Sequence, residues 1–230
     1  MCADSLDLYQ GRYALLPAYY FIQVAKGYRI MNTENTVRVW DVSVRIFHWS
    51  LVISFAVAYV TGEESDLIHA YAGYVVLALL CYRIVWGIVG SRYARFSSFL
   101  FGPATTISYI KNLLGGKAKR YLGHNPAGSA MVFVLLISLS ITVWTGLELY
   151  ATEGKGPLAD NAIIVIGTAH ADGHENRGNG GEEFWEEFHE VASNFTLVMV
   201  FIHILGVLFS SKLHKENLVK AMITGRKRAP

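Results

Sequence analysis

Four long runs of apolar residues dominate the hydropathy pattern of this 230-residue chain. They cover about residues 44–62, 69–90, 127–149 and 189–210, and polar segments separate them. Each run is long enough to cross a hydrocarbon core roughly 30 Å thick as a helix, and none alternates as a transmembrane β-strand does. Backbone groups inside a bilayer must bond to one another. These runs therefore predict an all-α integral membrane protein, a four-transmembrane-helix bundle.

The composition excludes an ordinary soluble domain, because 53% of the residues are hydrophobic and only 17% are charged. Cys2 and Cys81 are too few for a disulfide framework, and no C-x-x-C-H motif is present to attach a haem covalently. Residues 1–30 lack the pattern of a signal peptide, and Met31 follows them directly. We interpret residues 1–36 as an N-terminal extension without an assigned function, with a translation-start artefact before Met31 as the alternative. The membrane domain is predicted to cover residues 37–228.

Basic and acidic residues are segregated along the chain. Lysines and arginines gather between the second and third runs and in the C-terminal tail, whereas the short turn after the first run and the long loop 151–188 are acidic. The positive-inside rule places the basic segments in the cytoplasm. We therefore expect a multi-pass protein of the bacterial cytoplasmic membrane with both termini inside and loop 151–188 in the periplasm.

Histidines in the apolar runs carry the main chemical signal. His189 and His203 lie fourteen residues apart, which on a helix is almost four turns and roughly 21 Å, so both leave one face at two depths. His69 opens the second run at the outer depth, and His48 lies near the inner start of the first. Two neutral imidazoles complete the iron shell of a b haem. Depth therefore predicts two b haems, an outer one on His69 and His189 and an inner one on His48 and His203.

Two arginines and two glycines accompany these histidines. Arg83 lies fourteen residues after His69, at the inner depth, and Arg45 lies close to His48 in sequence. A buried guanidinium needs an anionic partner, so both are predicted to bind haem propionates, with snorkelling to the interface as the alternative for Arg83. Gly73 and Gly206, each one turn from a predicted ligand, leave room for a flat macrocycle or serve as helix contacts.

Structural interpretations of the same histidines are also open. A histidine at a helix end can sit among lipid headgroups, and one within a span can bond to a neighbouring helix. The remaining histidines fall in polar segments, where a surface position is favoured over a metal site. These histidines are His124, His170, His174 and His214.

Several short motifs together resemble one known family. They are 37–41 (VRVWD), 45–49 (RIFHW), 69–74 (HAYAGY), 83–96 (RIVWGIVGSRYARF), 123–128 (GHNPAG) and 218–228 (LVKAMITGRKR). This combination resembles the prokaryotic cytochrome b561 family, which includes the cytochrome b subunits of nickel-iron hydrogenases. The resemblance implies four helices, two b haems held from the first, second and fourth helices, and exchange of electrons with membrane quinone. The ligand positions of that family correspond to His48, His69, His189 and His203, the same four histidines that the depth argument pairs.

A related cytochrome, the subunit of membrane-bound formate dehydrogenase, holds quinone beside its inner haem near the start of the third helix. By that resemblance Asn125 and Gly128 are candidate quinone residues. The alternative for Asn125 is a cap on the third helix, since Pro126 suits the first turn.

These features predict an electron-transfer protein or a quinone-reactive oxidoreductase subunit. Because bis-histidine iron has no vacant position, electron transfer is favoured over oxygen chemistry, and no residue is assigned as catalytic. The expected partners are quinone, membrane lipid and a periplasmic c-type cytochrome or hydrogenase, docked on loop 151–188, and nucleic acid is excluded. An anchor without electron transfer and a small-solute channel are the alternatives. The segment 103–114 is predicted to lie as an amphipathic helix in the membrane interface.

Overall fold

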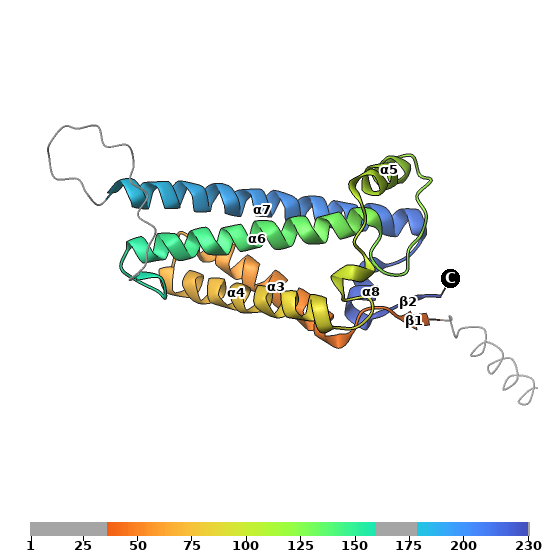
Figure 1. The fold of residues 1–230 in the computed structure, drawn as a ribbon, viewed down its shortest axis with the longest axis horizontal. Helices are drawn as coiled ribbons and strands as arrows, with labels where there is room; N and C mark the ends of the chain where they lie inside the picture. Colours follow the sequence, from red (N-terminus) through yellow and green to blue (C-terminus); the bar gives the residue numbers. More distant parts are fainter. Residues whose placement is uncertain (1–35, 160–178, 230) are drawn as a thin grey trace, which may run out of the picture. The chain divides into compact units, whose positions relative to one another are not determined.

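A computed structural model describes residues 36–159 and 179–229 and contains four long helices in those ranges (Figure 1). All four are long and apolar enough to cross a membrane. Their bounds are α3, Val42–Thr61; α4, Asp66–Val89; α6, Pro126–Thr152; and α7, Asn179–His214. The predicted all-α bundle of four membrane-spanning helices is therefore confirmed.

The helix starts follow from local sequence chemistry. Asp41 precedes α3, and its carboxylate accepts a hydrogen bond from the backbone N–H of Val44 at 2.7 Å. Asn125 does the same for α6, accepting from the N–H of Gly128 at 2.7 Å, and Pro126 occupies the first turn. Each side chain satisfies an N–H group that the first helical turn leaves without a partner.

The helices pack in two main pairs, α3 with α4 and α6 with α7, and α4 also contacts α6 (Figure 1). A small apolar core lies where these helices meet. The residues of this core are Val76, Leu80 and Leu139, with Leu51, Phe55, Leu136 and Val143 packed against them. Many large apolar side chains elsewhere point outward; Ile53, for example, is 63% exposed and Leu205 is 64% exposed. Such a surface suits acyl chains rather than water.

Helix α7 begins earlier than hydropathy indicates. The sequence predicts a span from about 189 and a loop over 151–188, whereas the structure has residues 179–188 in the helix. The loop prediction is therefore wrong for these ten residues. Four glutamates lower the mean hydropathy of these ten residues. Trp185 between them is nevertheless buried and packs edge-on against Trp144 of α6, with ring centres 5.7 Å apart. An amphipathic extension of this kind is invisible to a hydropathy window.

Shorter elements complete the described chain. The predicted helix over 103–114 is present as α5, Pro103–Leu114, while its position in the membrane interface stays a prediction. The other short elements are η1, Phe96–Ser98; α8, Leu218–Thr224; and the strands β1, Thr36–Arg38, and β2, Arg226–Arg228, which form a two-stranded sheet. The helices belong to one compact unit, Arg38–Arg226. The predicted extension up to residue 35, and the loop histidines His170 and His174, lie outside the described residues.

Candidate cofactor site

The structure brings the four histidines together in two pairs. His69 of α4 faces His189 of α7, with ring centres 5.9 Å apart and ring planes at 86°. His48 of α3 faces His203 of α7, with ring centres 6.5 Å apart and planes at 53°. Helix α7 thus supplies one ring to each pair, as its fourteen-residue spacing predicts. We call the first the outer pair and the second the inner pair.

The ring separations match what two imidazoles need to share one metal ion. A histidine nitrogen binds a metal at about 2.0–2.1 Å, so two that bind from opposite sides place their ring centres roughly 6–6.5 Å apart. The 6.5 Å of the second pair agrees with that distance, and the 5.9 Å of the first pair is slightly shorter. In the part of the chain that the structure describes, no cluster of three or more histidine, cysteine or carboxylate side chains is placed to hold a metal. Two ligands alone fit a metal whose other ligands come from a macrocycle.

Hydrogen bonds fix the orientation of the outer pair. The Nδ1 atom of His69 lies 2.8 Å from the carbonyl oxygen of Ala58, and that of His189 lies 3.0 Å from the carbonyl oxygen of Thr142 and 3.1 Å from the hydroxyl of Thr145. Because a carbonyl only accepts, Nδ1 donates its hydrogen in each case and the lone pair resides on Nε2. Both outer rings therefore present a metal-binding nitrogen.

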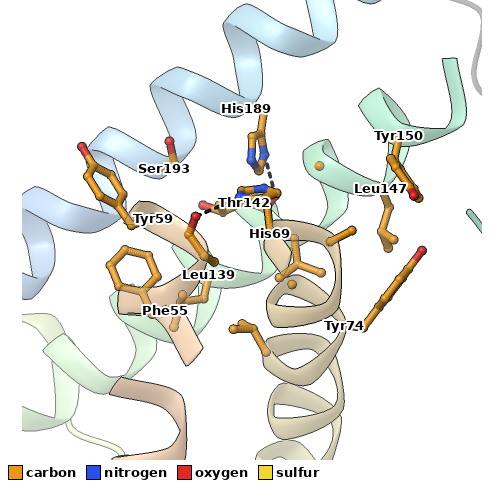
Figure 2. Close-up of a pocket in the computed structure, with 16 residues that line it drawn as sticks. Phe55, Tyr59, His69, Tyr74, Leu139, Thr142, Leu147, Tyr150, His189 and Ser193 are labelled. Atoms are coloured by element: carbon orange, nitrogen blue, oxygen red, sulfur yellow. Dashed lines mark hydrogen bonds between the residues drawn. The ribbon is translucent and has the colours of Figure 1, made fainter. Parts of the chain in front are cut away.

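A cavity surrounds the outer pair. It encloses about 720 Å³ of space free of atoms, part of it open to the surroundings, and aromatic and aliphatic side chains of α3, α4, α6 and α7 line it. Figure 2 shows Tyr59, Tyr74 and Tyr150 around the two imidazoles.

Glycines shape this cavity. A Cβ on Gly146 would lie 2.8 Å from Cε1 of His189, so only glycine leaves room for that ring. A Cβ on Gly73 or on Gly206 would meet no described atom within 4 Å. Neither position is therefore a close contact between described helices. Gly73 lines the cavity and Gly206 does not, and the macrocycle role of both glycines stays a prediction.

The inner pair is held differently. The Nδ1 atom of His48 is buried and has no hydrogen-bond partner among the described residues, and its ring contacts Trp49 edge-on. A buried polar atom without a partner is destabilising unless a ligand satisfies it. Hydrogen bonds fix the tautomer of the outer rings, whereas no described hydrogen bond at Nδ1 fixes that of His48.

The guanidinium of Arg83 reaches the segment that follows α4, so both the propionate interpretation and the snorkelling alternative stay predictions. Its side chain is 4% exposed, donates from Nη2 to the carbonyl oxygen of Ala94 at 3.1 Å and lies 4.7 Å from the ring centre of Phe96. Arg45 donates from Nη1 to the carbonyl oxygen of Ile223. Nη1 of Arg83 and Nε of Arg45 are buried without a described partner. The propionate role of both arginines stays a prediction, with one buried nitrogen on each that has no described partner.

The start of α6 supports the capping interpretation of Asn125. Its side-chain oxygen is used by the N–H of Gly128, so the amide nitrogen is the group that remains for a ligand. His124 packs between Trp40 and Phe99, with ring centres 4.7 and 4.3 Å away, rather than at an open surface. The quinone role of Asn125 and Gly128 stays a prediction.

Sequence reasoning missed the groups that support these side chains. Thr142, Thr145 and Gly146 hold the ring of His189, but nothing in a span of small and apolar residues distinguishes them from helix contacts. The sequence did contain a signal for Asp41, because this residue ends the motif 37–41 that resembles the known family.

Asp41 joins the start of α3 to the end of α4. Its carboxylate accepts hydrogen bonds from the indole of Trp86 at 3.2 Å and from the hydroxyl of Ser91, in addition to the N–H of Val44. Partial burial alone raises the pKa of Asp41, but these hydrogen bonds outweigh it and hold the pKa below its ordinary value. The carboxylate is thus ionised at neutral pH and ties the two helices together.

Comparisons with known proteins find relatives that are named as hydrogenase cytochromes. A protein of Azotobacter chroococcum mcd 1 named a probable Ni/Fe-hydrogenase B-type cytochrome subunit is 24% identical, over 89% of this chain and 93% of that protein. A Rhodobacter capsulatus protein of the same name is 23% identical, over 86% and 83%. A protein of Escherichia coli K12 named a probable Ni/Fe-hydrogenase 1 B-type cytochrome subunit is 29% identical, over 54% and 65%. No solved structure gives a significant match.

The family comparison covers all four helices of the bundle. The family model of prokaryotic cytochrome b561 matches residues 39–225, a range that includes both histidine pairs and the Asp41 contacts. With a match over most of its length, the chain belongs to the prokaryotic cytochrome b561 family.

Proposed function

We propose that this protein is a dihaem cytochrome b subunit that passes electrons between a Ni/Fe hydrogenase on the outer side of the membrane and the quinone pool. The observation that carries the proposal is the presence of two facing histidine pairs, 5.9 and 6.5 Å between ring centres, on helices that can span a membrane. Two cofactor positions at different depths provide a route for electrons across the bilayer.

The proposal assigns a role to both histidine pairs and to the groups that surround the outer pair. His69 and His189 would hold one haem b, and His48 and His203 the other. Bound haem supplies one-electron transfer and, with both axial positions taken by imidazole, offers no vacant position to oxygen. The carbonyls of Ala58 and Thr142 orient the outer rings and increase the basicity of the coordinating nitrogens. The apolar cavity wall excludes water from the site.

The choice of partner rests on the relatives. Three similar proteins are named as probable Ni/Fe-hydrogenase cytochrome subunits, and two of them align with this chain over more than four-fifths of their length. The acidic first turns of α7, with Glu182, Glu183, Glu186 and Glu187, provide a charged surface at the proposed outer end. Charge of this kind orients a protein partner and sets its association rate.

The first experiment counts cofactors and follows their reduction. The purified full chain is expected to show two b haems per chain by pyridine haemochrome and to become reduced by hydrogen only when a Ni/Fe hydrogenase is added, then reoxidised by a quinone. One haem would mean that one histidine pair is not a ligand set. If the chain binds no haem, the anchor or the channel becomes the favoured function. If a c-type cytochrome reduces the haems and the hydrogenase does not, the partner is a c-type cytochrome.

Asn125 provides a test of the quinone position. We expect Asn125→Ala to keep the haem spectrum, to lose about 1 kcal/mol of unfolding free energy because the α6 cap is gone, and to raise the KM for quinone. Asn125→Asp is the matched variant, because aspartate keeps the cap but has no amide N–H to donate. It should raise the KM for quinone without the loss of stability. A wild-type KM for quinone in Asn125→Asp would mean that Asn125 caps α6 and has no part in quinone binding.

A further inference from the structure

A groove outside the proposed haem and quinone sites lies where α7 ends and α8 begins. It encloses about 1020 Å³, including open solvent, and we call it the α7–α8 groove. The residues that line it are Leu208, Ser211, Lys212, Lys215, Glu216, Asn217, Val219, Lys220 and Ile223. All of them belong to the compact unit that contains the bundle.

The charge of the groove is positive. Lys212, Lys215 and Lys220 are exposed, and neither of the two ion pairs found in the described ranges involves them. Glu216 is the acidic residue of the lining, and it is already paired with Arg120. Three ammonium groups therefore face one opening with no carboxylate left to neutralise them there.

Hydrogen bonds hold the turn between α7 and α8, where these lysines lie, in one conformation. Lys215 ends α7 with a φ of 50°, in the left-handed region that residues other than glycine seldom adopt. Ser211 holds the turn: its carbonyl oxygen accepts from the N–H of Glu216 at 3.0 Å and its hydroxyl from the N–H of Leu218 at 3.3 Å. Asn217 caps α8 through the N–H of Lys220 at 2.7 Å. The strained residue persists because these bonds determine the turn.

Apolar side chains complete the groove on the bilayer side. Leu208, Val219 and Ile223 are 55, 43 and 58% exposed. Leu208 lies one turn of α7 before Lys212, so the apolar wall and the lysines follow each other along a helix that reaches the membrane surface. A ligand that fills the groove needs an anionic head and a hydrocarbon part at that depth.

We propose that the α7–α8 groove binds one acidic phospholipid, with its phosphate among Lys212, Lys215 and Lys220 and an acyl chain against Leu208, Val219 and Ile223. Basic pockets beside membrane helices bind such headgroups, and each lysine near the surface strengthens the interaction by a factor of about five. A free phosphate would satisfy the lysines but not the apolar wall. The site is independent of the cofactor and quinone assignments.

The test counts lipid on the haem-loaded full chain. The protein is exchanged into phosphatidylcholine nanodiscs with a minor fraction of phosphatidylglycerol, released, and examined by native mass spectrometry. We expect one retained phosphatidylglycerol on the wild type. The triple variant Lys212→Gln, Lys215→Gln and Lys220→Gln should bind it about a hundredfold more weakly. The matched control, Lys111→Gln, Lys117→Gln and Lys119→Gln, removes the same charge outside the groove and should retain the lipid.

Each outcome decides the proposal. Equal retention by both triple variants, or equal retention of phosphatidylcholine by the wild type, overturns it. Displacement by millimolar inorganic phosphate overturns the lipid assignment in favour of a plain anion site. If the triple variant loses its helical circular dichroism, the single variants Lys212→Gln and Lys220→Gln are compared with Lys111→Gln, and a loss of about fivefold is expected only in the groove.

Discussion

Replacing His189 with alanine is expected to lower the haem content to about half of the wild-type value, because only the outer iron would lose an axial ligand. The inner pair lies at the other depth and shares no side chain with the outer one. The remaining haem should stay in exchange with quinone, while reduction from the hydrogenase side is blocked. Haem content is read by pyridine haemochrome, and each path by stopped-flow reduction from one side.

The converse variant sharpens this result. His203→Ala lies on the same helix and should remove the inner haem instead, leaving hydrogenase-driven reduction of the outer haem intact but ending exchange with quinone. His214→Ala, at the end of α7, is the control and should keep both haems. Two haems in His189→Ala would exclude this residue as a ligand. Loss of both haems from each single variant would show that the pairs do not bind independently.

Replacing Asp41 with alanine is expected to cost about 2–4 kcal/mol of unfolding free energy. The variant loses the cap of α3 and leaves the N–H of Trp86 and the hydroxyl of Ser91 without their acceptor. Denaturation of the purified protein in detergent, followed by circular dichroism, measures the change. Glu63→Ala, an exposed acid in the turn after α3, is the control and should change stability by less than about 0.5 kcal/mol. An equal change in both variants would contradict the assigned role.

The same carboxylate predicts a pH dependence. The pKa of Asp41 in the folded protein is below its ordinary value of 3.8, so the stabilisation is complete above about pH 4 and is lost as the pH falls through the lowered pKa. Asp41→Asn keeps a capping oxygen but has no such titration. The difference in stability between the wild type and Asp41→Asn should therefore shrink on acidification below pH 4. A difference that stays constant would mean that the charge of Asp41 has no part in it.

The sequence by itself determined the bundle and the histidine pairs. Apolar runs in a bilayer can only form helices, so their number and order follow from hydropathy. His189 and His203 lie fourteen residues apart on one helix, so they share a face of that helix however it packs against the others. The charge distribution assigned a depth to His48 and His69, and the structure has the pairs that this depth predicts.

Only the tertiary structure decided what surrounds those rings. The hydrogen bonds from Nδ1 of His69 and His189 end on backbone carbonyls of other helices, and a carbonyl carries no sequence signal. The need for glycine at position 146 arises from a ring on α7, which periodicity within α6 cannot show. Likewise, the early start of α7 depends on the burial of Trp185 against α6. Each of these features is a contact between two helices. The hydropathy and periodicity of a sequence report only the face and the depth of a residue on its own helix.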